Sequence, residues 1–413
     1  MKQSAILALV LLALAAAAAA QEPAAGQPGA FLRFGAGARG LAMGGAGAGL
    51  ADDAGALAAN PAGLEQVRSP ELLLFHADLL EDTRYGFVGL VYPVGRLGTF
   101  GLSGVILQSD GYERATLTDD LGETFADSRN ALQLTLARRV GSVSLGLTYR
   151  HVNQSLAGYS GGGDGLDLSL FSRPWRVLSV GLMLQNLMAP RVTLYQDEEV
   201  YPLTLRAGLA LHLAGGRLLP VMDLVRVGDG PTILQAGCEY WTFGRFALRA
   251  GWDTGLNGYA AGGGYRQGPW QFDYAVSDTP IGLSHRLSLT WRFGRTPLGV
   301  SMEASTARFS PSGELNKVDL QLESGLRGRA RGWELVIYTP AGEPCHSARG
   351  TKEPPAVYSW DGRDDRGRLV PTGRYRVVIV VLDEFGDPWT QETAVEIRDY
   401  DPDLKTPVRM EMH

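Results

Sequence analysis

The sequence lacks several features that define helical membrane proteins and disulfide-rich secreted proteins. Beyond residue 20 it has no run of about 18 apolar residues, so no transmembrane helix is predicted there. It has only 2 cysteines, Cys238 and Cys345, which fall in different predicted domains, and we expect two free thiols. The net charge of −6 gives no reason to expect nucleic acid as a partner.

Residues 1–20 have the pattern of a secretory signal peptide. Lys2 is followed by AILALVLLALAAAAAA, which ends in small residues before Gln21. This run is too short, and too rich in alanine at its end, for a membrane span. No cysteine follows it that would carry a bacterial lipid anchor. We therefore expect the mature protein to leave the cytoplasm.

Most of the following chain alternates apolar and polar residues with the two-residue period of β-strands. Val143, Leu145 and Leu147, for example, fall on one face of a strand. The predicted strands are 71–79, 84–94, 97–108, 129–140, 142–154, 165–173, 176–188, 202–213, 217–226, 231–241, 244–253, 258–267, 268–277 and 284–293. Most reach the roughly nine to eleven residues that a tilted membrane strand requires, whereas strands of soluble sandwiches run nearer five or six.

The connections between these strands also alternate. One set is tight: VGRLG, RVGS, SRPWR, AGGR, TFGR and QGPW. The other set includes long loops at 109–128, 155–164 and 189–201. Short turns on one side and longer loops on the other are typical of outer-membrane barrels, with the short turns in the periplasm. We therefore predict an all-β fold: a transmembrane antiparallel barrel of about 14 strands over 70–295.

The stretch 34–64, FGAGARGLAMGGAGAGLADDAGALAANPAGL, has neither a strand period nor an uninterrupted helical stripe. On composition alone it is either a flexible tether or a segment packed inside the barrel, and the barrel has a lumen to fill. In the second case, lumen-facing arginines are expected to hold Asp52 and Asp53 by charge-assisted hydrogen bonds. The arginines that the alternation places in the lumen are Arg206, Arg245, Arg249, Arg286 and Arg292.

A different module is predicted over 300–400, followed by a tail at 401–413. Its short alternating strands and its Gly, Pro and Asp turns suit a small β-sandwich of about 100 residues. The acidic residues Asp361, Asp364 and Asp365 have no spacing that matches a known calcium loop, so no metal site is predicted.

The opening stretch resembles a known family through four ordered submotifs: Gly-Ala-Arg, Met-Gly-Gly, Asp-Asp-Ala and Asn-Pro-Ala-Gly. It resembles the N-terminus of the PorV/PorQ outer-membrane proteins. Its second half is also similar to fatty-acid-transporter (FadL-type) barrels, whose fold is a fourteen-stranded barrel with an N-terminal hatch. The resemblance covers about 30–294 and implies a hatch within 21–69. The implied hatch or gating residues are Phe34, Gly37, Arg39, Met43, Gly44, Gly45, Asp52, Asp53, Asn60, Pro61 and Gly63.

The C-terminal module has a resemblance of its own. The series FSPSG, YTPAGEP and WDGRDDRGRLVPTGRYRV looks like the Ig-like domain at the end of flagellar-hook capping proteins (FlgD-like). The opening FSPSGELN departs from the commoner FSPNGDG, which weakens the idea of a polar or metal-binding first turn. The even number of barrel strands would place this domain in the periplasm.

The two resemblances imply two functions for a barrel in the outer membrane. PorV-type barrels act in type IX secretion, which implies export or surface attachment of secreted proteins, with secretion-machinery or cargo proteins as partners beside the membrane lipid. FadL-type barrels imply transport of hydrophobic small molecules as the alternative. The Ig-like domain favours protein partners, because a small-molecule transporter has no obvious use for it.

An enzyme is not expected, and neither is a cofactor. His151, Asn153 and Ser155 share one strand face, which suggests hydrolase chemistry at first sight. Same-face neighbours on a strand lie about 6.5–7 Å apart, however, which is too far for direct hydrogen bonds between a nucleophile and its base. A polar strand end explains these residues better.

Overall fold

The computed structural model describes residues 27–79, 83–115, 120–255, 258–279, 282–293, 300–311, 316–324, 330–382 and 388–398. The predicted signal peptide and the tail at 401–413 lie outside the described residues. The chain divides into two compact units, Met1–Arg295 and Thr296–His413. Within the described ranges, no helix is long and apolar enough to cross a membrane.

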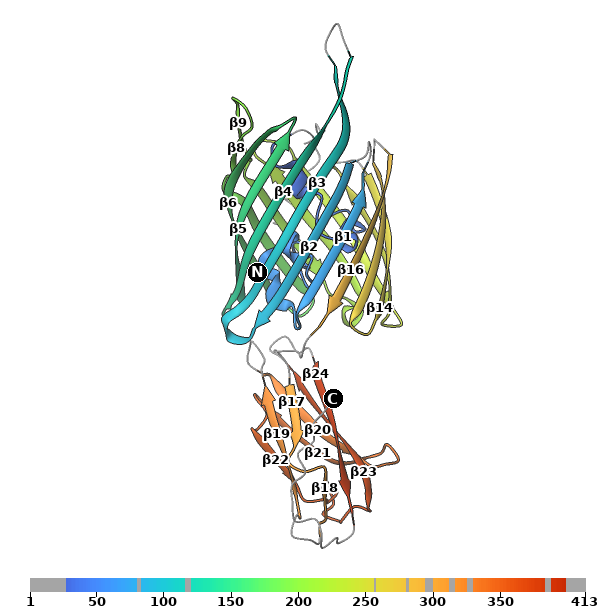
Figure 1. Cartoon of the computed structure of the whole chain (residues 1–413). Helices are drawn as coiled ribbons and strands as arrows, with labels where there is room; N and C mark the ends of the chain where they lie inside the picture. Colours follow the sequence, from blue (N-terminus) through green and yellow to red (C-terminus); the bar gives the residue numbers. More distant parts are fainter. Residues whose placement is uncertain are drawn as a thin grey trace, which may run out of the picture. The chain divides into compact units, whose positions relative to one another are not determined.

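The first unit is a closed antiparallel barrel (Figure 1). Its strands are β1 (Glu71–Asp78), β2 (Thr83–Val94), β3 (Gly98–Ala115), β4 (Asp120–Val140), β5 (Val143–Leu156), β6 (Tyr159–Trp175), β7 (Leu178–Met188), β10 (Thr204–Leu211), β11 (Leu218–Val227), β12 (Thr232–Thr242), β13 (Phe246–Asp253), β14 (Gly258–Gln267), β15 (Trp270–Thr279) and β16 (Gly282–Arg292). β1 closes the barrel against β16, with Glu71 opposite Arg292. The predicted barrel and its 14 strands are confirmed.

The barrel wall is apolar outside and largely polar inside, which follows from the strand period. In β5 the side chains of Leu145 and Leu147 are exposed on the outer face, whereas Thr148 and Arg150 are buried in the lumen. Large apolar side chains on most other strands are exposed in the same way, including Leu102, Leu134, Leu205, Leu248, Phe272 and Leu287. An exterior of this kind is stable against lipid and unfavourable against water.

Two of the predicted long loops are wrong. β3 and β4 continue into 109–128 as a paired hairpin, which Figure 1 shows extending beyond the other strands. Tyr112 stacks on Phe125 across this hairpin with ring centroids 5.5 Å apart. The polar composition of 109–128 gives no sign of this cross-strand aromatic contact in the sequence. In 155–164 the strands β5 and β6 extend until only a two-residue turn remains. The loop 189–201 contains its own short hairpin, β8 (Arg191–Thr193) and β9 (Glu198–Val200).

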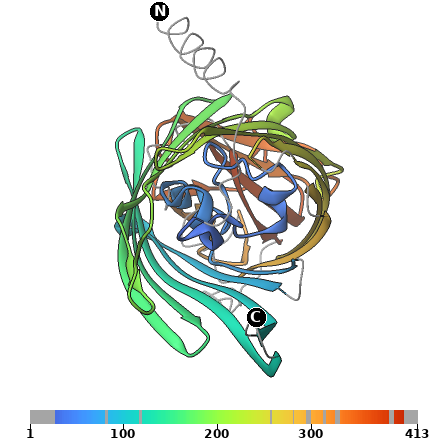
Figure 2. The same cartoon turned by 90° about the horizontal axis from the view of Figure 1, so that it is seen from above.

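Residues 27–67, here called the lumenal segment, lie within the ring of strands (Figure 2). The segment contains the 3₁₀ helix η1 (Ala30–Arg33), the helices α2 (Ala38–Leu41) and α3 (Ala56–Ala59), and the 3₁₀ helix η2 (Pro61–Gln66). Its small side chains are almost completely buried, among them Ala38, Ala42 and Ala62. A segment of small residues therefore packs against the wall, as the second of the two interpretations of 34–64 requires.

The second unit has two sheets around a core of its own. One sheet has the order β17-β19-β22 and the other β18-β24-β23-β20-β21. The strands are β17 (Val300–Ala304), β18 (Arg308–Phe309), β19 (Val318–Ser324), β20 (Gly332–Tyr338), β21 (Pro344–Thr351), β22 (Val357–Trp360), β23 (Gly373–Leu382) and β24 (Pro388–Ile397). Both sheets contribute to one buried cluster, in which the Trp360 ring packs edge-on against Phe309 and Tyr375.

Candidate functional site

Side chains of the barrel wall hold the backbone of the lumenal segment in place. Asp223 of β11 accepts hydrogen bonds from the N–H groups of Gly47 and Ala48 at 2.9 and 3.0 Å. Ser169 of β6 accepts one from the N–H of Ala62 at 3.0 Å. Backbone groups buried away from water need such partners, because an unpaired one costs as much as a lost hydrogen bond. The wall therefore replaces the strand pairing that this segment lacks.

Asn60 and Pro61 fix the point where the segment turns toward β1. Asn60 is extended, with φ −165° and ψ 96°, which is the conformation that the following proline favours. Its side-chain amide donates to the carbonyls of Ala48 and Leu170 at 2.9 and 3.0 Å, and its side-chain oxygen accepts from the N–H of Ala62. The side chain therefore binds the segment to itself and to β6, and it caps η2 at its first turn.

Arg39 of α2 is the centre of the charge network at this site. Its guanidinium donates two hydrogen bonds to Glu239 of β12, at 2.9 and 2.7 Å. The same group binds Asp52 at 2.6 Å and Asp53 at 2.7 Å. A planar guanidinium is suited to this, because it presents paired donors to carboxylates. The network ties α2 both to the wall and to the rest of the segment.

The predicted partners of Asp52 and Asp53 are therefore wrong. Both carboxylates are held by an arginine of their own segment, which lies only a short distance away along the chain. Within the described residues, the lumenal arginines of the wall have other carboxylate partners or none. Arg206 pairs with Asp223, Arg249 with Glu239 and Asp273, and Arg292 with Glu71.

The structure places Arg206, Arg249, Arg286 and Arg292 on the inner face of the wall, as predicted. The prediction for Arg245 is wrong, because this residue lies in the turn before β13 and is exposed. β13 begins one residue later than the position where its first inward side chain was expected. Residues 243–245 form the turn instead, so Arg245 does not reach the lumen.

The glycines of the segment are required at some positions and not at others. Gly44 and Gly45 have φ of 70° and 83°, which disfavours any residue with a Cβ. A Cβ on Gly44 would also lie 2.5 Å from the carbonyl oxygen of Trp252. Gly37 is extended, with φ −179°, a backbone conformation that does not require glycine. A Cβ on Gly63 would lie 2.3 Å from the Cβ of Ala51, so glycine is needed there because the two backbones approach closely.

A cavity of about 150 Å³ lies between the lumenal segment and the wall. Apolar side chains line part of it, namely Leu32, Phe34, Leu41 and Leu73. The Met43 side chain is buried beside it. The cavity thus has both apolar and charged walls, and it is bounded by strands on one side and by the segment on the other.

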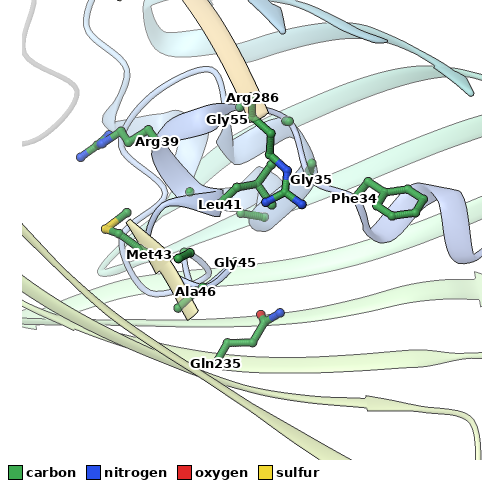
Figure 3. A pocket seen from close by; sticks show the side chains of 18 of the residues that line it. Phe34, Gly35, Arg39, Leu41, Met43, Gly45, Ala46, Gly55, Gln235 and Arg286 are labelled. Atoms are coloured by element: carbon green, nitrogen blue, oxygen red, sulfur yellow. The ribbon is translucent and has the colours of Figure 1, made fainter. Parts of the chain in front are cut away.

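Arg286 of β16 is a charged group of this cavity that has no counter-ion within the described residues. It is 8 % exposed, and Figure 3 shows its side chain reaching toward Leu41 and Gly35. Within the described residues no carboxylate lies close enough to form an ion pair with it. Gln235, on another side of the cavity in Figure 3, has a buried side-chain oxygen without a hydrogen-bond partner among the described residues. An unpaired buried cation and an unpaired acceptor are costly unless something else binds them.

Several residues of the site were not predicted. Glu239 and Asp223 accept most of the hydrogen bonds that hold α2 and the following turn. Tyr85 of β2 donates from its hydroxyl to the carbonyl of Gly35 at 2.8 Å. The two acidic residues fall at inward positions of predicted strands, and that position was the signal available in the sequence. Tyr85 is on the inner face as well, but an aromatic near a strand end has no distinctive pattern.

The residues considered for hydrolysis lie on the outer face of the barrel. His151, Asn153 and Ser155 are all exposed near the end of β5. His151 Nδ1 and the Tyr149 hydroxyl both contact Asp164 of β6, at 2.9 and 2.6 Å. The group forms a polar patch across two strands.

The acidic turn of the second unit is fully engaged by its own chain. Asp364 accepts hydrogen bonds from the N–H groups of Arg368 and Arg366, both at 2.9 Å, and these lower the pKa of its carboxyl. Asp365 accepts from the N–H of Ser347 at 3.0 Å. The described residues contain no group of three or more His, Cys, Asp or Glu side chains placed to hold a metal ion.

The barrel was compared with known protein families and solved structures. The profile of the Uncharacterised protein family (UPF0164) matches residues 11–162, which is less than half of the chain. No curated protein matches the sequence. The solved structure of the CymD monoaromatic hydrocarbon channel is similar with a TM-score of 0.50 and 15% identity, covering 64% of this chain and 100% of that one.

Other solved structures are similar at a lower level. The P. putida toluene transporter TodX has a TM-score of 0.46 and 13% identity, covering 64% of this chain and 100% of its own. A Pseudomonas aeruginosa FadL homologue has a TM-score of 0.46 and 13% identity, with 63% and 99% covered. At these identities the likeness concerns the fold alone, and of the three structures described the CymD channel is the one similar enough to support it.

Proposed function

We propose that this protein is an outer-membrane channel of the FadL type that carries hydrophobic small molecules. The observation that carries the proposal is the cavity of about 150 Å³ beside the lumenal segment, with an apolar part lined by Leu32, Phe34, Leu41 and Leu73. A cavity of about this volume holds one benzene molecule. The apolar exterior of the barrel supports a membrane location, because such a surface is stable in lipid.

The similarity to a monoaromatic hydrocarbon channel supports the same substrate class. That likeness concerns the fold, so the cavity has to supply the argument for the substrate. Arg286 gives the cavity a preference for ligands with a carboxylate, because an unpaired buried guanidinium binds a carboxylate more strongly than a neutral group. The proposed substrates are therefore molecules of about one aromatic ring, both neutral hydrocarbons and aromatic acids such as benzoate.

The sequence analysis favoured export of secreted proteins and gave this transport function as the alternative. The comparisons support the alternative better, and they give no support to type IX secretion or to secretion-machinery partners. The relation to PorV/PorQ proteins stays part of the proposal, because four submotifs of the lumenal segment carry it. The hatch role of that segment rests on its place within the ring of strands.

The proposal also covers the second unit. Its two sheets around one core are consistent with an Ig-like domain of the FlgD-like kind. Glu71 at the start of β1 lies opposite Arg292 at the end of β16, so the chain leaves the barrel at the end where it entered. The tight turns lie at this same end, which supports a periplasmic location for the domain.

Two neighbouring alanines test the proposed function. Ala260 of β14 lines the cavity, whereas Ala261 faces outward from the next position of the same strand. Ala260→Phe fills the cavity and is expected to abolish uptake of labelled toluene by cells that express the protein in their outer membrane. Ala261→Phe adds the same ring on the lipid side and should leave uptake unchanged. Equal uptake by both variants and the wild type, with all three folded, contradicts the proposal.

A further inference from the structure

The outer surface of the barrel has a groove of about 770 Å³ that crosses six strands, from β14 through β15, β16, β1 and β2 to β3. Figure 1 shows β16, β1, β2 and β3 side by side on the near face of the barrel. Most of the residues that line the groove face outward, and its lining is mostly apolar. The large apolar side chains among them are Leu74, Val88, Ile106, Phe272, Leu287 and Leu289. The groove is therefore a feature of the surface that faces the membrane.

Two glycines at outward positions make the hollow. Gly86 of β2 lies opposite Ile106 of β3, and Gly104 of β3 lies opposite Val88 of β2, so each glycine has a large apolar neighbour across the strand pair. A Cβ on either glycine would meet no atom within 4 Å. A glycine inside a strand weakens the strand and often marks a place where another molecule approaches the backbone closely. The space above these two glycines is open to such a molecule.

The strand register places the groove between an aromatic row and a polar row of the outer surface. Toward the tight turns, Trp270 and Trp291 stack with ring centroids 5.4 Å apart. Toward the other end of the barrel, Asp78 lies opposite both His285 and Arg84. Aromatic side chains mark a membrane interface, and charged side chains lie outside the hydrocarbon region. The apolar rows between them therefore face lipid chains, and a hollow in these rows is filled by hydrocarbon.

Arg84 stands at the polar end of the groove, two residues beyond Gly86 on the same outward face of β2. Its side chain is exposed, and it forms no hydrogen bond or ion pair within the described residues. Asp78 lies opposite Arg84 across the strand pair, but its carboxylate contacts His76 Nε2 at 3.1 Å instead. A guanidinium at the level of the lipid headgroups is suited to phosphate, to which it presents paired donors. The groove thus combines an apolar hollow with a cation at one end.

We infer that this groove is a binding site for one membrane lipid, with an acyl chain in the hollow at Gly86 and Gly104 and the lipid phosphate on Arg84. The site faces the leaflet on the side away from the tight turns, which is the outer leaflet in the proposed location. The inference rests on the membrane location that belongs to the proposed function, and not on transport. Loss of toluene uptake would contradict the channel, whereas lipid binding is measured without any uptake.

Native mass spectrometry of the purified full chain in detergent measures lipid binding directly. The probes are dimyristoyl phosphatidylglycerol and dimyristoyl glycerol, which share their acyl chains and differ in the phosphate headgroup. The wild type is expected to bind one phosphatidylglycerol per chain, about tenfold more tightly than the diacylglycerol, which is the effect of one charge-assisted hydrogen bond. Equal affinity for the two lipids overturns the inference.

Filling the hollow tests the place of the acyl chain. Gly86→Leu with Gly104→Leu puts two side chains into open space, so the barrel should still fold, and the affinity for both lipids should fall by about tenfold or more because the chains lose buried contact area. Ala207→Leu with Ala236→Leu adds the same side chains at outward positions of β10 and β12 outside the groove, and it should bind as the wild type does. Heat-modifiable migration in a gel reports folding. Unchanged binding by the folded groove variant, or equal losses in both variants, contradicts a lipid site in the groove.

A second pair of variants tests the headgroup and does not touch the hollow. Arg84→Gln removes the charge and is expected to bring phosphatidylglycerol down to the affinity of the diacylglycerol, whose own binding should not change. Arg226→Gln removes another exposed arginine from the outer face, on β11, and should leave both affinities as they are. A preference for phosphatidylglycerol that survives Arg84→Gln overturns the assignment of the phosphate. A wild-type dimer that disappears when the hollow is filled would make a second copy of the chain the occupant, and this result also overturns the inference.

Discussion

Two arginines of the barrel wall, Arg249 and Arg286, differ in whether a carboxylate lies beside them. Arg249 has two carboxylate partners, Glu239 at 2.6 Å and Asp273 at 2.8 Å. Arg286 is buried to a similar degree beside the cavity and has no carboxylate partner within the described residues. A buried pair is neutralised and contributes to structure, whereas a buried single charge is available to a ligand. The difference separates a structural arginine from a binding one.

Replacing Arg286 is expected to change selectivity more than folding. Arg286→Met removes the charge and keeps a long side chain, so benzoate uptake should fall about tenfold, the effect of losing one charge-assisted hydrogen bond. Toluene uptake should stay close to the wild-type rate, because a neutral ring gains little from the guanidinium. Arg286→Lys, which keeps the charge, is the control. Parallel uptake assays with both labelled compounds measure the ratio, and an equal loss for both compounds argues against a carboxylate site.

At the residue scale, the sequence predicts the face of a side chain better than its partner. The two-residue period places Arg206 and Arg249 in the lumen because a strand has only two faces. It cannot say which of several carboxylates each arginine meets across a barrel. Arg39 shows this limit, because it pairs with Asp52 and with Glu239, and the second is 200 positions away along the chain. Only the closed barrel brings those two together.

The hairpin of β8 and β9 lies on the inner face of β6, where glycines make room for it. A Cβ on Gly161 would lie 2.3 Å from the carbonyl oxygen of Thr193, and one on Gly163 2.5 Å from that of Arg191. Val192 between them is completely buried. The backbone of the hairpin therefore rests on the backbone of β6 with no side chain between them. The GGG run at 161–163 serves this packing.

A single methyl group should therefore loosen this hairpin. Gly163→Ala places its Cβ against Arg191 and is expected to speed amide exchange in 190–201, because the hairpin must move away from β6. Gly162→Ala is the matched control, since residue 162 faces outward and its Cβ would meet the Val152 carbonyl oxygen at 3.0 Å and the His151 ring at 3.5 Å, with no contact to the hairpin. Exchange measured by mass spectrometry on both folded variants gives the comparison. Equal protection of 190–201 in the two variants would show that the glycine contact does not hold the hairpin.

The sequence predicts barrel strands well and their outer ends poorly. Inside the membrane span the apolar and polar faces alternate, since one side meets lipid and the other the lumen. Beyond that span both faces of a hairpin meet water, so the alternation disappears while the pairing continues. This is why 109–128 looks like a loop and is a hairpin of β3 and β4. β8 was missed for another reason, because its three residues are too few to show a two-residue period.

The whole chain contains two units with separate cores, which the change of pattern near Thr296 indicates in the sequence. The barrel is organised around its lumenal segment, and its buried apolar cluster includes Leu57, Leu64 and Phe87. The core of the second unit is formed only by residues of that unit, around Trp360. The lumenal segment was located by its motif resemblance. Its glycine-rich composition has no strand or helix period from which its structure could be predicted. The cavity was beyond prediction, since its lining comes from segments distant in the sequence.

Separate cores predict that the second unit folds without the barrel. Residues 296–413 expressed alone should unfold in one cooperative transition in urea, followed by tryptophan fluorescence. Trp360, 1 % exposed and packed on Phe309 and Tyr375, is the largest side chain of this core, so Trp360→Ala is expected to lower the free energy of unfolding by about 3–5 kcal/mol. Val357→Ala, at an exposed position of the same strand, should change it by about 0.5 kcal/mol or less. A fragment without a cooperative transition, or equal losses from the two substitutions, would mean that this core does not stabilise the unit by itself.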